Sequence, residues 1–315
     1  MCFIGKGGCL TNHRTVVLTG SGGFIGRHYR ARYGGLPLGD PAGRVDLLDS
    51  DRVRKAIESN KPDMLVHLAA QSSVAVSVQD PVETYRVNFL GTLNLLQALV
   101  ETGFQGTFLF ASSAEIYGRI PNEELPVRES RGTRPRSPYA VSKVAAEALC
   151  YQYSQLGHFR VVIVRPFNQL GPGHASKFAI PSFAKQIAEI KLGLRPASLV
   201  TGNLDVSRDF TDVRDSIRAI NLLLDCGENG EAYNLCSGQE RTIRSVILAL
   251  LKSANIEAQL TVDPARLRVG EQQRLVGDNT KLVQQSGWNP EIPFSQTIDD
   301  LLNDVLAITE KQPNV

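Results

Sequence analysis

The chain has 315 residues, which is enough for one large α/β core with a smaller second lobe. Its formal net charge is +2, and its basic residues are spread along the sequence, so we expect no nucleic acid partner. The five cysteines lie far apart, without a CxxC or Cys/His spacing. This pattern predicts neither a disulfide framework nor a metal site, and it fits the reducing cytoplasm.

The sequence contains no sign of a membrane segment. No apolar run reaches the roughly 18 residues that a membrane helix needs. Residues 1–14 lack the apolar stretch of a signal peptide, and we expect them to form a disordered extension. A membrane is therefore not expected as a partner.

Short β-branched runs alternate with amphipathic stretches over much of the chain. Helices are predicted at Val87–Glu101 and Ala140–Leu156, and a third around Ile180–Leu192. The predicted strands are Val16–Leu18, Met64–Leu68, Thr107–Ala111, Val161–Val164 and Ala232–Leu235. Strands that alternate with helices are typical of an α/β fold with a Rossmann-type, doubly wound parallel sheet.

After Pro166 the alternation becomes irregular and Gly/Pro-rich loops appear, which suggests two parts. Residues 15–167 are expected to form the dinucleotide-binding domain, completed by residues at about 200–235. Residues 168–199 and 236–315 are expected to form mainly a smaller C-terminal substrate-binding lobe. The lobe would lie over the carboxyl edge of the sheet, where α/β folds bind ligands.

A glycine-rich turn follows the first predicted strand. The segment GSGGFIG at residues 20–26 leads directly from that strand into a helical stretch. Gly20, Gly23 and Gly26 let the backbone turn sharply, approach a pyrophosphate and pack the helix against the strand. The helix start, at Phe24 and Ile25, offers free N–H groups and a favourable dipole to an anion. The turn therefore predicts a dinucleotide site.

The spacing of TGSGGFIG resembles the turn of the extended short-chain dehydrogenases/reductases, the NAD-dependent epimerase/dehydratase family, and the resemblance runs from about Thr15 to the last helix. It implies NAD(H) or NADP(H) as cofactor. Asp40 lies at about the distance of the acidic residue that holds an adenosine ribose, although a plain turn explains it equally. Arginines in the first helix would instead favour a 2′-phosphate or a solvated surface: Arg27, Arg30 and Arg32. The choice between NAD and NADP stays open.

The same resemblance implies further cofactor contacts. Asp46 and Leu47 resemble the family's adenine-contacting pair, and Ala69-Ala70-Gln71 resembles the segment that passes under the cofactor. Asn88 occupies another family position, with helix capping or a core role as the alternative.

Tyr139 and Lys143 form a YxxxK pair, and on a helix both side chains project from one face. They follow the strand Thr107–Ala111 at the interval found in the family. Because an ammonium stabilises a phenolate, we expect Lys143 to lower the pKa of Tyr139 and to hold the nicotinamide ribose. Ser113 matches the family's hydrogen-bond donor to the reacting oxygen, and strand alternation lets only one of Ser112 and Ser113 face the site.

The surrounding residues distinguish between reaction types. Glu115 resembles the glutamate with which GDP-mannose 4,6-dehydratases remove the sugar C5 proton, although it also fits a solvated carboxylate in a reductase. The loop RPFNQLGPG at residues 165–173 instead resembles GDP-4-keto-6-deoxy-D-mannose reductases. We therefore expect NAD(P)H-dependent reduction of the C4 keto group of a GDP-4-keto-6-deoxy hexose. The alternatives are the dehydratase and a nucleotide-sugar 4-epimerase.

The resemblance also implies a set of residues that bind the nucleotide-diphosphate sugar. Arginine and lysine suit the pyrophosphate, a glutamate suits ribose hydroxyls, and a phenylalanine would line the base pocket. The set comprises Asn168, Phe178, Lys191, Arg208, Arg268 and Glu271. A surface ion pair for each arginine and a core position for Phe178 are the plain alternatives.

Two further expectations concern the whole molecule. The helices Val87–Glu101 and Ala140–Leu156 resemble the pair through which such enzymes form a four-helix homodimer. A nucleotide-binding regulator without activity would share the fold, but the presence of Ser113, Tyr139 and Lys143 argues for an enzyme.

Overall fold

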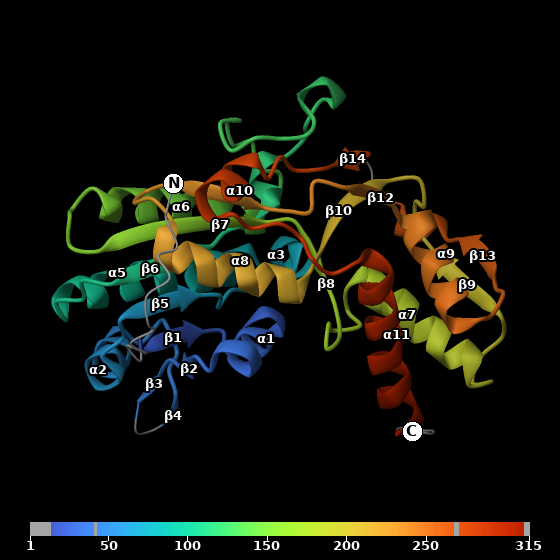
Figure 1. Ribbon diagram of the computed structural model, residues 1–315, viewed down its shortest axis with the longest axis horizontal. Helices are drawn as coiled ribbons and strands as arrows, with labels where there is room; N and C mark the ends of the chain where they lie inside the picture. The colour runs from blue at the N-terminus through green and yellow to red at the C-terminus, as the bar shows by residue number, and fades with distance from the viewer. Residues whose placement is uncertain (1–13, 41–42, 268–270, 312–315) are drawn as a thin grey trace.

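The computed structural model describes residues 14–40, 43–267 and 271–311, which form a parallel six-stranded sheet and a smaller lobe (Figure 1). The strand order is β11-β7-β6-β5-β1-β2, and every pairing in this sheet is parallel. The strands are β1 (Val16–Thr19), β2 (Leu36–Pro37), β5 (Met64–His67), β6 (Thr107–Ala111), β7 (Arg160–Pro166) and β11 (Ala232–Leu235). The predicted α/β fold with a parallel sheet is confirmed, and the short strand β2 is the one that periodicity did not reveal.

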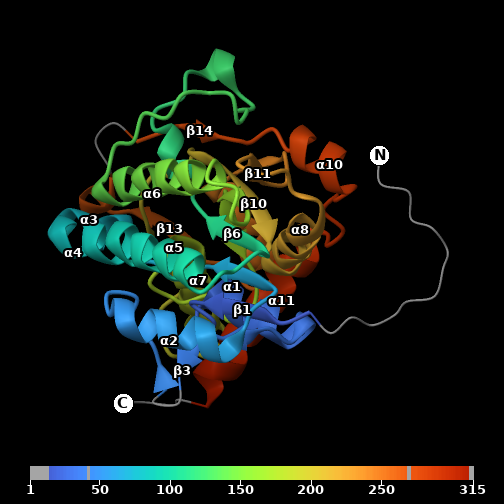
Figure 2. The ribbon, with the colours of Figure 1, turned by 90° about the vertical axis from the view of Figure 1, so that its left-hand side faces the viewer.

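Helices cover both faces of this sheet, so it is doubly wound (Figures 1 and 2). One face carries α1 (Phe24–Tyr33), α8 (Val213–Cys226) and α10 (Thr280–Ser286); the other carries α2 (Ser50–Asn60), α5 (Gly91–Glu101) and α6 (Pro138–Ser154). Val17 and Leu18, neighbours in β1, enter opposite cores, as strand alternation requires. Because both faces are buried, the strands are continuous apolar runs rather than alternating ones.

The smaller lobe has its own core of helices packed on short strands. Its helices are α7 (Ala179–Lys191), α9 (Ile243–Ala254) and α11 (Phe294–Glu310). Its strands are β8 (Asn168–Leu170), β9 (Ser198–Thr201), β10 (Ser207–Asp212), β12 (Glu240–Thr242), β13 (Gln259–Val262) and β14 (Arg274–Leu275). Apolar residues of the three helices, such as Ile187, Leu250 and Leu301, form one buried cluster.

Shorter elements complete the described chain. They are β3 (Gly39–Asp40), β4 (Gly43–Arg44), α3 (Val74–Gln79), α4 (Pro81–Tyr85), the π-helix η1 (Arg86–Leu90), and the 3-10 turns η2 (Ala114–Tyr117), η3 (Asn122–Glu124) and η4 (Pro264–Arg266). Among the residues that the structure describes, no helix is both long and apolar enough to cross a membrane.

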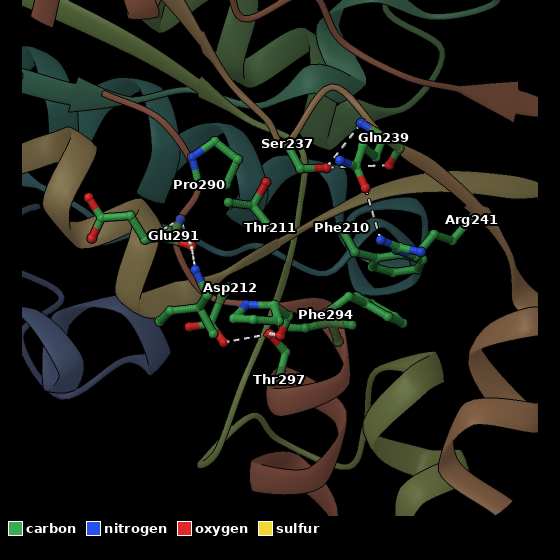
Figure 3. Close-up of a pocket in the computed structure, with 14 residues that line it drawn as sticks. Phe210, Thr211, Asp212, Ser237, Gln239, Arg241, Pro290, Glu291, Phe294 and Thr297 are labelled. Carbon is green, nitrogen blue, oxygen red and sulfur yellow. Dashed lines mark hydrogen bonds between the residues drawn. The ribbon is translucent and has the colours of Figure 1, made fainter. Parts of the chain in front are cut away.

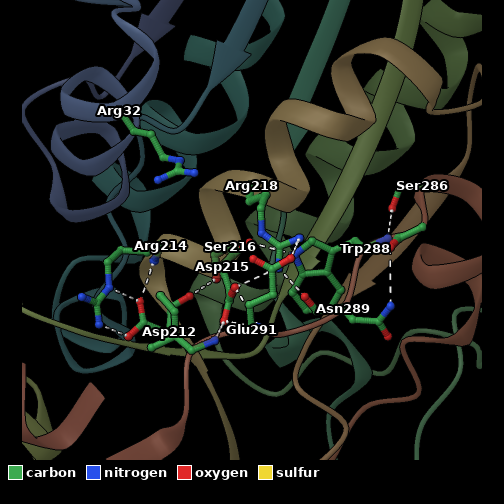
Figure 4. A network of polar contacts seen from close by, with 12 residues as sticks. Arg32, Asp212, Arg214, Asp215, Ser216, Arg218, Ser286, Trp288, Asn289 and Glu291 are labelled. Carbon is green, nitrogen blue, oxygen red and sulfur yellow. Dashed lines mark hydrogen bonds and ion pairs between the residues drawn. The ribbon is translucent and has the colours of Figure 1, made fainter. Parts of the chain in front are cut away.

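A buried carboxylate fixes the chain where it passes from the sheet domain back to the lobe (Figure 4). Asp215 of α8 accepts hydrogen bonds from the backbone N–H groups of Glu291 and Ile292 and from the Arg218 side chain at 2.9 Å. The indole of Trp288, which is fully buried, donates to the Asp215 carbonyl at 2.9 Å. The part of the chain from α10 to Trp288 therefore packs on the sheet domain, although it lies in the range expected to be mainly lobe.

Candidate active site

The glycine-rich turn requires glycine because other backbone segments approach it closely. Gly20 has φ +66°, and a β-carbon there would lie 2.7 Å from the backbone nitrogen of Ala69. A β-carbon at Gly26 would overlap the carbonyl oxygen of Gly20. Helix α1 begins at Phe24 with Gly23 as N-cap, and no side chain caps the N–H groups of its first turn. This cradle fits a dinucleotide pyrophosphate.

The two segments expected beside the cofactor are hydrogen-bonded to each other. The Asn88 side chain accepts from the Gln71 N–H at 2.8 Å and donates to the Gln71 carbonyl at 3.0 Å. It also donates to the Ser142 hydroxyl at 2.9 Å, on the helix that carries the YxxxK pair. Asn88 lies in the π-helix η1, a distortion that is frequent at functional sites.

The residues expected to contact the adenine, Asp46 and Leu47, lie in different environments. Asp46 is exposed and accepts from the Leu48 N–H at 3.0 Å. Leu47 is buried in the core under α2 and α5. Its side chain lies close to Gly91, where a β-carbon would come within 3.1 Å of it.

Ser113, Tyr139 and Lys143 meet at the carboxyl end of β6. The Ser113 side chain hydrogen-bonds Tyr139, and the Lys143 ammonium donates to the Ala111 carbonyl at 2.7 Å. Ser112, the neighbour of Ser113, is buried with a hydroxyl that has no partner. Of the two serines, only Ser113 therefore reaches the phenol.

Burial is the largest influence on the pKa values of Tyr139 and Lys143. It raises the pKa of Tyr139 to about 12; the hydrogen bond from Ser113 lowers the pKa and the charge of Glu115 raises it. Burial also lowers the pKa of Lys143 to about 8. The raised pKa of Tyr139 differs from the expected lowering by Lys143, because the cost of burying a phenolate dominates. A neutral phenol is suited to donating a proton.

Glu115 lies two residues after Ser113, in the turn η2. It is exposed, and its backbone N–H donates to the Ser113 hydroxyl at 3.2 Å. Its charge raises the pKa of Tyr139. An exposed carboxylate next to the phenol fits both a base and a solvated surface group.

Of the expected substrate residues, two meet in the lobe. Arg208 and Glu271 form an ion pair at 3.6 Å, and Arg208 also donates to the Gln272 carbonyl at 2.9 Å. Gln272 in turn bonds to Ile120, just after the strand-end segment of Ser113. These contacts place the Arg208–Glu271 pair beside the catalytic segment.

The other expected substrate residues are dispersed. Asn168 begins β8, which pairs with β10, and donates to the Asp209 carbonyl at 3.3 Å. Phe178 is the N-cap of α7 and Lys191 is its exposed last residue, so the two are about 20 Å apart. Arg268 lies outside the described residues.

Two features near the glycine-rich turn were not anticipated from the sequence. The guanidinium of Arg44 lies over Gly22, 3.3 Å from where a β-carbon would stand. The His174 ring stacks on Phe24 with centroids 4.3 Å apart and lies 4.8 Å from the Phe178 ring. Only the fold brings the loop of His174 onto α1. A basic residue close after the second strand was the available signal for Arg44.

A cavity of about 200 Å³ lies apart from this cluster, where the lobe meets the start of α8 (Figure 3). Its carboxylates are already paired: Asp212 accepts from Thr297 at 2.7 Å and from Arg214 at 2.7 Å. None of Ser113, Tyr139 and Lys143 lines it. We interpret it as part of the seam between the two parts.

The parallel sheet, the glycine-rich turn and the Ser113–Tyr139–Lys143 cluster define an enzyme of the extended short-chain dehydrogenase/reductase class. Residues 42–301 match the family of GDP-mannose 4,6 dehydratase, and the chain belongs to this family. The resemblance drawn from the motifs is confirmed.

Three known proteins show how similar the relatives are. GDP-6-deoxy-D-mannose reductase of Pseudomonas aeruginosa is 44% identical over 92% of this chain and 96% of that protein. The structure of RMD from Pseudomonas aeruginosa complexed with NADPH has a TM-score of 0.89 and 42% identity, covering 94% of this chain and 99% of that chain. The UDP-glucose 4-epimerase of Thermus thermophilus in complex with NAD has a TM-score of 0.79 and 32% identity, covering 92% of this chain and 98% of that chain.

Proposed function

We propose that this enzyme reduces the C4 keto group of a GDP-4-keto-6-deoxy hexose to give a GDP-D-rhamnose-type product, with NADPH as reductant. The observation that carries the proposal is the buried, neutral Tyr139 phenol hydrogen-bonded to Ser113, which is the arrangement of a proton donor. Similarity to a GDP-6-deoxy-D-mannose reductase, at 44% identity over nearly the whole chain, supports the substrate.

In this proposal each side chain has one task. The reduced nicotinamide supplies the hydride to the sugar carbonyl carbon. Tyr139 donates its proton to the carbonyl oxygen, while the Ser113 hydroxyl donates a hydrogen bond to that oxygen as negative charge develops. Lys143, protonated at neutral pH, would hold the nicotinamide ribose and help the phenol to regain its proton.

The cofactor proposal rests on the glycine cradle and on Arg44. Phe24, Ile25 and the glycines of the turn would hold the pyrophosphate, with Ala69–Gln71 and Asn88 beside the nicotinamide half and Asp46 near the adenosine. The Arg44 guanidinium over Gly22 is suited to the 2′-phosphate of NADPH, because a charge-assisted bond to phosphate is strong. The similar structure with bound NADPH supports the same choice.

The nucleotide-diphosphate part of the substrate would lie on the lobe. Arg208 and Glu271, already paired beside the catalytic segment, are suited to the diphosphate and a ribose. Phe178 would contact the base, and we retain Asn168, Lys191 and Arg268 as candidate ligands. The expected division, with residues 168–199 and 236–315 mainly in the substrate lobe, belongs to this proposal.

The test is to incubate the purified enzyme with GDP-4-keto-6-deoxy-D-mannose and either NADPH or NADH, following the absorbance of the reduced cofactor and identifying the sugar. We expect stoichiometric oxidation of NADPH and a 6-deoxyhexose product. A parallel sample contains GDP-mannose alone. A 4-keto sugar appearing there without loss of reduced cofactor would overturn the reductase proposal.

That parallel sample tests the second candidate, a GDP-mannose 4,6-dehydratase, which the exposed Glu115 beside Tyr139 favours. Glu115→Gln would then abolish elimination while leaving the fold intact, whereas a reductase would retain most of its turnover. A 4-epimerase, the third possibility, would interconvert C4 epimers without consuming external reductant.

We further propose that the enzyme is a cytoplasmic homodimer. The interface would form on the two expected helices, η1 with α5 and α6. Apolar side chains are exposed on η1, on α6 and on the neighbouring α4: Leu90, Val141, Tyr151 and Val82. Such a row of exposed apolar groups is typical of a protein contact surface. Free Cys150 and Cys236, both buried, are compatible with the reducing cytoplasm.

A further inference from the structure

A buried ion pair ties the catalytic helix to the central sheet. Glu147 of α6 receives two hydrogen bonds from the Arg165 guanidinium at the end of β7, at 3.0 and 2.8 Å. Each residue is only 8% exposed. The bidentate geometry holds the two groups in one relative orientation, which a single hydrogen bond or a lysine would not do.

The same guanidinium also reaches the strand end that carries the catalytic serine. Arg165 donates to the Tyr117 hydroxyl at 2.9 Å and to the Glu129 carbonyl at 3.0 Å. The Tyr117 hydroxyl donates to the Asn234 side chain at 2.7 Å, on β11. Tyr117 and Asn234 are fully buried. Arg165 therefore joins four chain segments through one planar group.

The spacing along the chain connects this network to the reacting groups. Tyr139, Lys143 and Glu147 are four residues apart on α6, so they share a helix face. Tyr117 ends the short turn η2, which starts directly after Ser113. Glu147 is thus about one helical turn from Lys143, and Tyr117 is four residues from Ser113.

We propose that the Arg165–Glu147 pair is a positioning device for the reaction, which holds the helix bearing Tyr139 and Lys143 at a fixed distance from the strand end bearing Ser113. The proposal rests on the proposed role of these three groups in proton transfer. Displacements of about 1 Å between reacting groups can cost about 100-fold in rate, so a rigid link has a kinetic effect without contacting substrate.

The pair also affects the charge of the catalytic lysine. Burial lowers the pKa of Lys143, while the carboxylate of Glu147 and the Cys150 thiol raise it. Lys143 in turn lowers the pKa of buried His67 on the other side. Removing the Glu147 charge would therefore lower the pKa of Lys143 further, with buried Arg165 then adding repulsion. A purely structural contact would produce no such change.

The experiment compares Glu147→Gln and Arg165→Lys with a matched control, Asp215→Asn, which removes the buried carboxylate of another arginine–carboxylate pair, Arg218–Asp215 on α8. All three are expected to lose stability. The amount of folded enzyme is measured by NADPH titration. For Glu147→Gln and Arg165→Lys, we expect kcat per folded enzyme to fall about 10- to 100-fold. We expect KM to change less than about threefold. For Asp215→Asn, kcat per folded enzyme should stay within about twofold of the parent, since distant sites act independently.

The second readout is the pKa of Lys143 from an NMR titration of lysine side chains labelled with carbon-13, with the Lys143 signal assigned by its loss in Lys143→Met; it needs neither turnover nor access of a reagent to the buried amine. We expect it to fall by roughly one unit in Glu147→Gln and to stay unchanged in Asp215→Asn. Unchanged kcat and unchanged Lys143 pKa in Glu147→Gln would overturn the proposal. The comparison uses whichever nucleotide-sugar reaction the parent catalyses, so failure of the parent with the 4-keto sugar concerns the proposed function alone.

Discussion

At the scale of single residues, burial decides which groups carry protons. Tyr139 keeps its proton because its pKa is raised to about 12, while Lys143 titrates near 8. The pair is therefore arranged for donation from the phenol at neutral pH. Lys143 would lose its charge above about pH 8, and activity should decline there.

Substitution of Tyr139 by phenylalanine removes the proton donor and little else. We expect Tyr139→Phe to lower kcat by about 100- to 10,000-fold with cofactor binding retained, because general acid catalysis contributes that much. Steady-state assays with a fluorescence titration of NADPH measure both quantities. Tyr153→Phe, on the same helix, is the control and should match the parent. Full activity of Tyr139→Phe would refute the assigned mechanism.

Arg44 allows a prediction about cofactor choice. Arg44→Gln should raise KM for NADPH about 10- to 100-fold, since a charge-assisted hydrogen bond is worth about 1.5–3 kcal/mol, and should leave KM for NADH nearly unchanged. Arg54→Gln, an exposed α2 arginine paired with Glu58, is the control for a general loss of positive charge. Equal changes for both cofactors would show that Arg44 does not contact the 2′-phosphate.

At the scale of elements, a buried hydrogen-bond chain joins β1, β5 and the helix of Asn88. His67 shares hydrogen bonds with Thr19 at 2.6 Å and with Thr92 at 2.9 Å, and Thr92 donates to the Asn88 carbonyl at 2.6 Å. Burial lowers the pKa of His67 to about 3. The imidazole is therefore neutral in the folded protein, where one ring nitrogen donates and the other accepts.

This chain predicts how stability depends on pH. An unfolded histidine takes up a proton below about pH 6.5, whereas folded His67 does so only near 3, so the unfolding free energy falls as pH falls through that window. The slope contributed is up to about 1.4 kcal/mol per pH unit. Urea unfolding of His67→Gln between pH 7 and 4.5 should show a shallower slope than the parent. Exposed His158→Gln should keep the parental slope; identical slopes in all three proteins would contradict the prediction.

At the scale of the whole molecule, the exposed apolar row on α4, η1 and α6 predicts dimerisation. Tyr151, 58% exposed, should lie in the interface, and Leu248, 53% exposed on α9, should not. Tyr151→Glu should weaken the dimer at least about tenfold, because it buries a charge against an apolar partner. Leu248→Glu should leave it unchanged. Sedimentation at micromolar concentration measures both; a monomeric parent would refute the dimer.

The fold could be predicted from the sequence because the patterns that indicate it lie within short segments of the chain. The buried strands β5 and β6 are continuous apolar runs in the sequence. The glycine-rich turn between β1 and α1 is typical of a dinucleotide-binding fold. The helix predicted at Val87–Glu101 was right in extent, but a π-helical segment around Asn88 interrupts it. The Asn88 side chain in this segment bonds to Gln71 and Ser142, and sequence periodicity cannot reveal contacts between such distant segments.

The sequence by itself predicted the parallel sheet and the phosphate-binding turn, because both follow from short-range spacing, and its resemblance to the family indicated Ser113, Tyr139 and Lys143. Only the tertiary structure decided that Arg44 lies over Gly22, that His174 stacks on Phe24 and that Arg165 joins Glu147 to Tyr117. It also decided the protonation of Tyr139 and Lys143, since desolvation depends on everything that surrounds a group. Contacts between distant segments and the dielectric around a side chain exist only once the chain has folded.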